Sequence, residues 1–180
     1  MSVAVVAGAL ANKPGNGGEA WVRMSWARGL ARLGFDVWFI ESISDPGGSP
    51  AELERSAPVR FFRDVTEANG FAGRRALRAG DRLLHVSPAE WEDLADACGL
   101  LVNISGHWRP DPWFERIPVK VYVDLDPGYT QIWAERGLLG DQLERHDAHY
   151  TVGLAVGTSA CDLPVDGVDW RPILQPVVLD

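Results

Sequence analysis

The sequence predicts a three-layer α/β fold, in which helices cover both faces of an open, mostly parallel sheet. Apolar runs alternate with helical patterns along most of the chain, and the first strand–helix–strand unit is short. It consists of an apolar run at 3–8, a helical segment at 19–33 and the run FDVWFI at 35–40. Such a unit implies two parallel strands joined by a right-handed crossover.

The helix expected at 19–33 carries small residues on one face, among them Ala20, Ala27 and Ala31. A face of small side chains lets a helix lie close to a sheet. Gly34 stands where a glycine ends a helix, because glycine adopts the left-handed conformation that the position after the last turn requires. The next strand follows at once.

The middle of the chain is less regular. A loop is expected from residue 44, then a short helix at 51–55, and RFFRDV at 60–65 fits either a strand or a helix. Arg74, Arg75 and Arg78 are expected on a solvated face, although they would also suit a phosphate or a partner domain.

Clearer patterns return after residue 86. Ser87-Pro88-Ala89-Glu90 is a capping box with proline at the first helical position, which predicts a helix to about Cys98. Buried strands are expected at 100–105 and 119–126, a helix at 130–135, and a last strand in AHYTVG. These elements complete the alternating pattern.

The organisation predicted is one domain over 1–156, followed by an irregular tail over 157–180. The tail contains prolines and glycines with little periodicity and finishes on an apolar run. It therefore resembles a linker to a further domain that this sequence lacks. Its exposed apolar residues would otherwise suit a partner domain or a second copy of the chain.

Composition limits the classes of function. The chain has 46% hydrophobic and 23% charged residues, with a formal net charge of −8, which are typical of a soluble globular protein. A negative surface disfavours nucleic acid as the main partner. No apolar run approaches the roughly 18 residues of a membrane span, and the start lacks the basic region of a signal peptide. We therefore expect a cytoplasmic protein.

Three loops follow the carboxyl ends of predicted strands, where ligands bind in open α/β sheets. They are residues 9–18, SGHW at 105–108 and DLDPGY at 124–129. The candidate binding and catalytic residues all lie in or next to these loops.

The first loop formally matches G-x-G-x-x-A at 15–20, and Glu41 stands where a ribose-binding acid would be expected. In the dinucleotide fingerprint, however, the first glycine follows the strand almost directly, whereas ALANKP intervenes here. The loop could instead be a flexible connector. The better interpretation is a backbone cradle, because Gly17 and Gly18 lack a Cβ and sit at a helix start that favours phosphate or sugar hydroxyls.

The stretch GNGGEAWVRMSWARGLARLGFDVWFIE resembles the opening of GT-B-fold glycosyltransferases, where a Gly-Gly loop leads into a helix and a second strand. NISGH, YVDLDPGYTQIW and HDAHYTVG resemble a bacterial group of such transferases. The resemblance implies a Rossmann-like N-terminal domain that binds mainly the acceptor. A C-terminal domain would hold most of the nucleotide-sugar donor, so this chain alone should be inactive.

Under this interpretation the partners are a nucleotide-sugar donor and a small-molecule or glycan acceptor, with no cofactor and no metal. The expected catalytic residues are His107 and Asp124. The expected substrate-binding residues are Asn16, Gly17, Gly18, Glu19, Asp126 and Tyr129.

Each assignment has a simpler alternative. His107 is a candidate general base because histidine titrates near neutrality, but a loop histidine can equally bind backbone. Alternation puts Asp124 and Asp126 on the same side for a shared ligand, while Asp-Pro-Gly is also good turn chemistry. Glu19 suits the first turn of a helix whatever the function. His146 and His149 are expected to be surface residues rather than zinc ligands, because no third ligand is well spaced.

Two further functions stay open at this point. One is a binding module that holds a small molecule or a partner chain without chemistry. The other is a nicotinamide-dependent oxidoreductase, which depends on the weak glycine match at 15–20.

Overall fold

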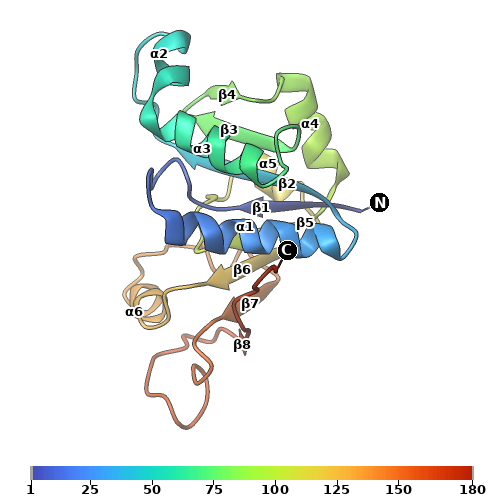
Figure 1. Cartoon of the computed structure of the whole chain (residues 1–180). Helices are drawn as coiled ribbons and strands as arrows, with labels where there is room; N and C mark the ends of the chain where they lie inside the picture. The colour runs from blue at the N-terminus through green and yellow to red at the C-terminus, as the bar shows by residue number, and fades with distance from the viewer. Residues whose placement is uncertain (1, 180) are drawn as a thin grey trace.

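A computed structural model describes residues 2–179, which form the predicted α/β fold around one eight-stranded sheet (Figure 1). The strand order is β4-β3-β2-β1-β5-β6-β7-β8, and the neighbouring strands are parallel except in the β3–β4 pair. In chain order the strands are β1 (Val3–Ala7), β2 (Asp36–Ile43), β3 (Arg75–Ala79), β4 (Arg82–Leu84), β5 (Cys98–Ile104), β6 (Lys120–Asp124), β7 (Ala148–Thr151) and β8 (Trp170–Pro172).

Helices cover both faces of this sheet, which confirms the predicted three layers. They are α1 (Gly17–Arg32), α2 (Pro50–Arg55), α3 (Ala57–Ala68), α4 (Pro88–Ala97), α5 (Pro112–Glu115) and α6 (Tyr129–Glu135). Residues of α1 and α3 pack with Val6 and Phe39 in one core. Residues of α4 and α5 pack with Val5 and Ile40 in a second core on the opposite face. The alternation of strand side chains thus divides the apolar residues between two cores.

Helix α1 forms where the sequence predicts it. Its N-cap is Asn16, whose side-chain oxygen accepts the Glu19 N–H. Gly34 follows the last turn with φ +93°, as its predicted role requires. Ala20 and Ala27 are buried against the sheet, so the small residues permit close packing.

The hairpin β3–β4 was not predicted, because four arginines obscure its strand pattern. Gly80 and Asp81 form its two-residue turn, with φ +59° at Gly80. The expectation that three arginines share a solvated face holds for Arg74, which is exposed, but is wrong for Arg75 and Arg78. Arg75 is buried and pairs with Glu67 at 2.7 Å, and the Arg78 guanidinium lies 4.2 Å from the Trp108 ring centroid.

The segment 157–179 is largely irregular but adds a strand that the sequence does not reveal. β8 pairs with β7 in parallel, so AHYTVG is not the last strand. Trp170 is buried in a third core with Tyr122, Leu143 and Val156. Beyond β8 the chain crosses toward α1, where the Leu179 carbonyl accepts a hydrogen bond from Arg32 (Figure 1).

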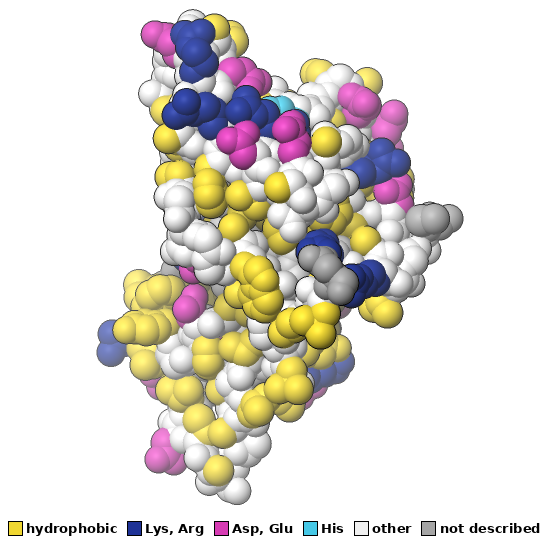
Figure 2. Space-filling view, viewed as in Figure 1, with side chains coloured by type: hydrophobic (Ala, Val, Ile, Leu, Met, Phe, Trp, Pro, Cys, Tyr) yellow, Lys and Arg dark blue, Asp and Glu magenta, His cyan; other side chains and the backbone are white. Residues whose placement is uncertain are grey.

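The surface drawn in Figure 2 shows charged side chains of both signs gathered over α2 and α3. Hydrophobic side chains are more frequent over the lower half, around α6 and the C-terminal segment. Within residues 2–179, no helix has the length and apolar character needed to cross a membrane.

Candidate functional site

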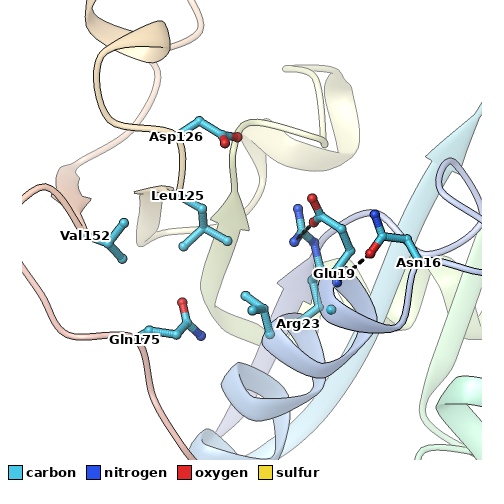
Figure 3. A pocket seen from close by; sticks show the side chains of 9 residues that line it. Asn16, Glu19, Arg23, Leu125, Asp126, Val152 and Gln175 are labelled. Carbon is cyan, nitrogen blue, oxygen red and sulfur yellow. Dashed lines mark hydrogen bonds and ion pairs between the residues drawn. The ribbon is translucent and has the colours of Figure 1, made fainter.

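A pocket of about 460 Å³ opens between α1 and the loops at the carboxyl ends of β6 and β7 (Figure 3). Its size falls within the range of about 300–1,000 Å³ that is typical of small-molecule sites. Figure 3 shows one wall formed by α1 and the other by the loops and the segment after β8. The lining residues are Asn16, Gly18, Glu19, Val22, Arg23, Leu125, Asp126, Val152 and Gln175.

The pocket lies where the fold favours a ligand. From β1 the chain continues outward through β2 and β3, whereas β5, β6 and β7 extend the sheet on the other side of β1. The connections after β1 and β5 therefore diverge, which leaves a crevice at the carboxyl edge of the strands. The first and third loops singled out from the sequence both contribute to this crevice.

The α1 wall presents polar groups of the helix start. Asn16 accepts the N–H of Glu19, while the N–H groups of Gly17 and Gly18 have no acceptor within the helix. A Cβ at Gly17 would meet nothing within 4 Å, and one at Gly18 would make only an ordinary contact with Asn16 at 3.7 Å. Open space therefore lies beside both glycines, and packing within this chain does not require glycine at either position.

Charges around the pocket are balanced. Glu19 accepts a hydrogen bond of 2.9 Å from Lys13 and forms an ion pair with Arg23. Burial raises the pKa of Glu19, but the hydrogen bond from Lys13 and the charge of Arg23 outweigh it and lower the pKa overall. Asp126 supplies the second carboxylate and acts electrostatically on Arg23. Two cations therefore face two anions.

His107 is close to this cluster but is not among the lining residues. Burial lowers the pKa of His107 to about 4, and the charges of Arg23 and Lys13 act in the same direction. The near-neutral pKa expected from the sequence is therefore wrong. The imidazole is neutral at pH 7 and a weaker base than a solvated histidine.

Asp124 has a structural role that the sequence does not distinguish from catalysis. Its buried carboxylate accepts hydrogen bonds from the hydroxyls of Thr130 and Thr151, each at 2.7 Å, and from the Gln131 amide at 3.0 Å. The Asp126 N–H donates to it as well, at 2.9 Å. All these donors belong to the protein, so Asp124 holds the β6 end, the start of α6 and β7 together.

The two carboxylates of the D-x-D pair do not share a ligand position. Asp124 is buried, whereas Asp126 is exposed and lines the pocket. The expectation that both face the same side is wrong, because β6 ends at Asp124 and the strand alternation stops there. Tyr129 begins α6 and is exposed outside the pocket lining.

Of the predicted site residues, Asn16, Gly18, Glu19 and Asp126 are brought together in the pocket. Arg23 was missed, although its position four residues after Glu19 places it on the same helix face. Leu125 is next to a predicted residue, but Val152 and Gln175 come from segments with no recognisable motif.

Glu41 does not have the ribose-binding role that the glycine pattern at 15–20 would give it. Its buried carboxylate accepts the backbone N–H groups of Leu10, Ala11 and Asn12, each at 2.7 Å. Burial raises the pKa of Glu41 to about 7, although these hydrogen bonds oppose the shift. Glu41 thus fixes the loop after β1 and is not free to bind a ribose.

The loop after β5 is fixed by buried polar side chains. Asn103 donates to the Trp108 carbonyl at 2.8 Å and accepts its N–H at 3.0 Å. Gly106 has φ +63°, and a Cβ there would approach the Tyr122 ring to 2.9 Å, so only glycine fits. Asn103 also contacts His146, which is buried rather than exposed as predicted.

Residues 2–179 contain no group of three or more histidine, cysteine, aspartate or glutamate side chains arranged to hold a metal ion. Comparison with protein-family models and with curated proteins finds no match for this chain. The site therefore has to be interpreted from its own geometry.

Proposed function

We propose that this chain is the acceptor-binding domain of a GT-B-type glycosyltransferase, and that its pocket holds a sugar acceptor. The observation that carries the proposal is the mixed polar and apolar lining of the pocket at the carboxyl edge of the sheet, in which the charges of Glu19 and Asp126 are offset by Arg23 and by the neighbouring Lys13. The donor would be a nucleotide sugar bound mainly by another domain.

The lining suits a neutral polyhydroxylated ring. Asp126 offers carboxylate acceptors for hydroxyl groups, and the Gln175 amide offers both a donor and an acceptor. Val22, Leu125 and Val152 provide apolar surface for the C–H groups of such a ring. The pocket therefore offers polar partners for the hydroxyl groups of a sugar and apolar surface for its C–H groups.

The same lining is a poor match for a nucleotide. A diphosphate favours an excess of positive charge, whereas Lys13 and Arg23 are already neutralised by Glu19 and Asp126. Glu41, which a dinucleotide site would need for the ribose, is occupied by three backbone N–H groups. These features disfavour a nicotinamide-dependent enzyme.

Chemistry at the acceptor hydroxyl would need a general base. His107 interacts electrostatically with Glu19 and Arg23, and burial lowers its pKa to about 4, so it is neutral at pH 7. We assign it this role under the proposal, with Glu19 as the carboxylate whose charge stabilises the imidazolium that forms. Asp124 then acts as a positioning residue rather than as a catalytic one.

Ligand-observed NMR with a panel of neutral saccharides tests the proposal. Asp126→Ala should weaken binding about tenfold or more, because a hydrogen bond to a charged group contributes about 1.5–3 kcal/mol. Asp93→Ala is the matched control, because Asp93 is an exposed carboxylate on α4, which packs on the opposite face of the sheet. Saccharide binding that Asp126→Ala leaves unchanged would remove this pocket from the proposal.

A non-catalytic binding module would share the pocket but would not need His107. Replacing His107 by asparagine in an active two-domain enzyme should abolish transfer and leave saccharide binding in place. Unchanged transfer would favour another base.

A further inference from the structure

Helix α6 displays an aromatic pair that the rest of residues 2–179 leaves partly exposed. The side chain of Tyr129 is 67% exposed and that of Trp133 is 44% exposed, and their ring centroids are 5.7 Å apart. The two residues are four positions apart, so they lie side by side on one helix face. By contrast, Trp91, Trp108 and Trp113 pack together in the second core.

Helix α6, which carries this aromatic pair, begins three residues after Asp126 of the pocket lining. The Thr130 N–H donates to the Asp126 carbonyl at 3.2 Å, so the chain from Asp126 to α6 is a compact turn. Gly128 has φ +100° in this turn, and three residues span at most about 11 Å, so the backbone of Tyr129 lies near Asp126, which lines the pocket. Figure 1 shows α6 directly beyond the end of β6, and Figure 2 shows hydrophobic side chains gathered over it.

The pair is also held in a fixed position. Asp124 binds the side chains of Thr130 and Gln131, and the Gln131 oxygen accepts the Gly128 N–H at 2.6 Å. The first turn of α6 is thereby anchored to the end of β6. An aromatic surface that is fixed before binding loses little conformational entropy when a ligand stacks on it.

We propose that Tyr129 and Trp133 form a stacking platform for a second sugar ring, so that the ligand of the pocket is a glycan of at least two rings. The inference rests on the proposed function, because it extends the same site. Aromatic rings offer flat apolar surface to the C–H face of a pyranose. The first ring would bind Asp126 in the pocket, and the next would leave it over α6.

Calorimetry with matched pairs of glucose and cellobiose, glucose and maltose, and galactose and lactose tests this, after a glycan array has chosen the pair that binds. The disaccharide should bind about tenfold more tightly than its monosaccharide. Trp133→Ala should remove that gain, about tenfold or 1.4 kcal/mol, and leave monosaccharide binding unchanged. Tyr129→Ala should act in the same direction.

Trp21→Ala is the matched control, because Trp21 is 51% exposed on α1 and does not line the pocket. Equal affinities for monosaccharide and disaccharide, or a gain that survives Trp133→Ala, would overturn the platform while leaving the proposed function in place. Absence of binding by every saccharide would overturn both. Tighter binding of phenyl glycosides than of disaccharides would replace the second sugar ring by an aromatic group.

Discussion

The side chain of Glu41 holds the loop after β1 in place through its backbone. It accepts three N–H groups from the loop that leads toward α1. An amide at this position keeps only one acceptor oxygen and brings an N–H₂ group toward the donors. The pocket wall at Asn16 and Glu19 thus depends on a residue that lies outside it.

We expect Glu41→Gln to lower the free energy of unfolding by about 1–3 kcal/mol for each backbone N–H left unpaired. Urea denaturation at pH 8, where the carboxyl is ionised, measures the loss. The difference from the natural protein should grow at pH 6, because burial raises the pKa of Glu41 from 4.5 to about 7 and the natural protein gains stability as this carboxyl is protonated, whereas the glutamine variant does not titrate. Glu135→Gln, at an exposed position on α6, is the control and should be neutral. Equal stability of Glu41→Gln at pH 8 would contradict this role.

His146 makes the protein sensitive to acid. Its Nδ1–H donates to the Gln142 carbonyl at 2.7 Å, and its Nε2 accepts from the Asn103 amide at 3.1 Å, which is the neutral tautomer. Burial lowers the pKa of His146 from 6.5 to about 4. Protonation would place a second N–H against the Asn103 amide donor.

Because the folded pKa of His146 lies below the unfolded one, its contribution is complete above pH 6.5 and is lost as the pH falls toward 4. The loss should reach about 3 kcal/mol. Chemical denaturation between pH 7 and 4 measures this loss. In His146→Gln the slope of the free energy of unfolding against pH should be smaller, because the contribution of His146 is removed. A variant slope identical to that of the natural protein would show that His146 already protonates freely in the fold.

At the scale of elements, α1 could be predicted because its cap and its end are local. Asn16 accepts from Glu19 three residues later, and Gly34 supplies the positive φ that closes the helix. We expect Asn16→Ala to cost about 1 kcal/mol, whereas Asn16→Ser should cost little, because serine also caps. Thermal and urea unfolding of both variants check the difference. Equal losses would mean that the side chain matters for something other than the cap.

The hairpin β3–β4 could not be predicted in the same way, because its stability depends on distant partners. The buried guanidinium of Arg75 is paired with Glu67, and the partly buried Arg78 with Asp111 and the Trp108 ring. Arginine stems can cover apolar surface while the guanidinium is paired. The Gly80–Asp81 pair between short alternating segments was the available signal.

The candidate site, like the fold, could be predicted only in part. Asn16, Gly18, Glu19 and Asp126 follow from the rule that ligands bind beyond the strand ends. Asp124 could not be separated from Asp126, because burial depends on where β6 ends. Gln175 enters the pocket only because β8 joins the sheet, and that pairing has no local signature.

For the whole molecule, β8 connects the C-terminal segment to the third core. Trp170 packs edge-on against Tyr122, with ring centroids 6.1 Å apart, and against His149 at 5.7 Å. We expect Trp170→Ala to cost about 3–5 kcal/mol, as for other buried aromatic residues. Trp21→Ala, at an exposed position, should change stability by less than about 0.5 kcal/mol.

Urea denaturation of the two tryptophan variants gives this comparison directly. Similar small losses would mean that the segment around β8 adds nothing to the stability of the sheet. A large loss confined to Trp170→Ala would show that Gln175 is carried by a stable part of the fold, as the pocket requires.

The central claim is that the pocket takes a saccharide and not a nucleotide. Parallel calorimetric titration of the chain with cellobiose, maltose, lactose, UDP, dTDP, GDP, ADP and NAD tests it most directly. The account predicts heat from at least one saccharide and none from the nucleotides, because the pocket charges are balanced and Glu41 is occupied. Clear binding of NAD or ADP, with none of any saccharide, would contradict it and favour the dinucleotide interpretation of residues 15–20.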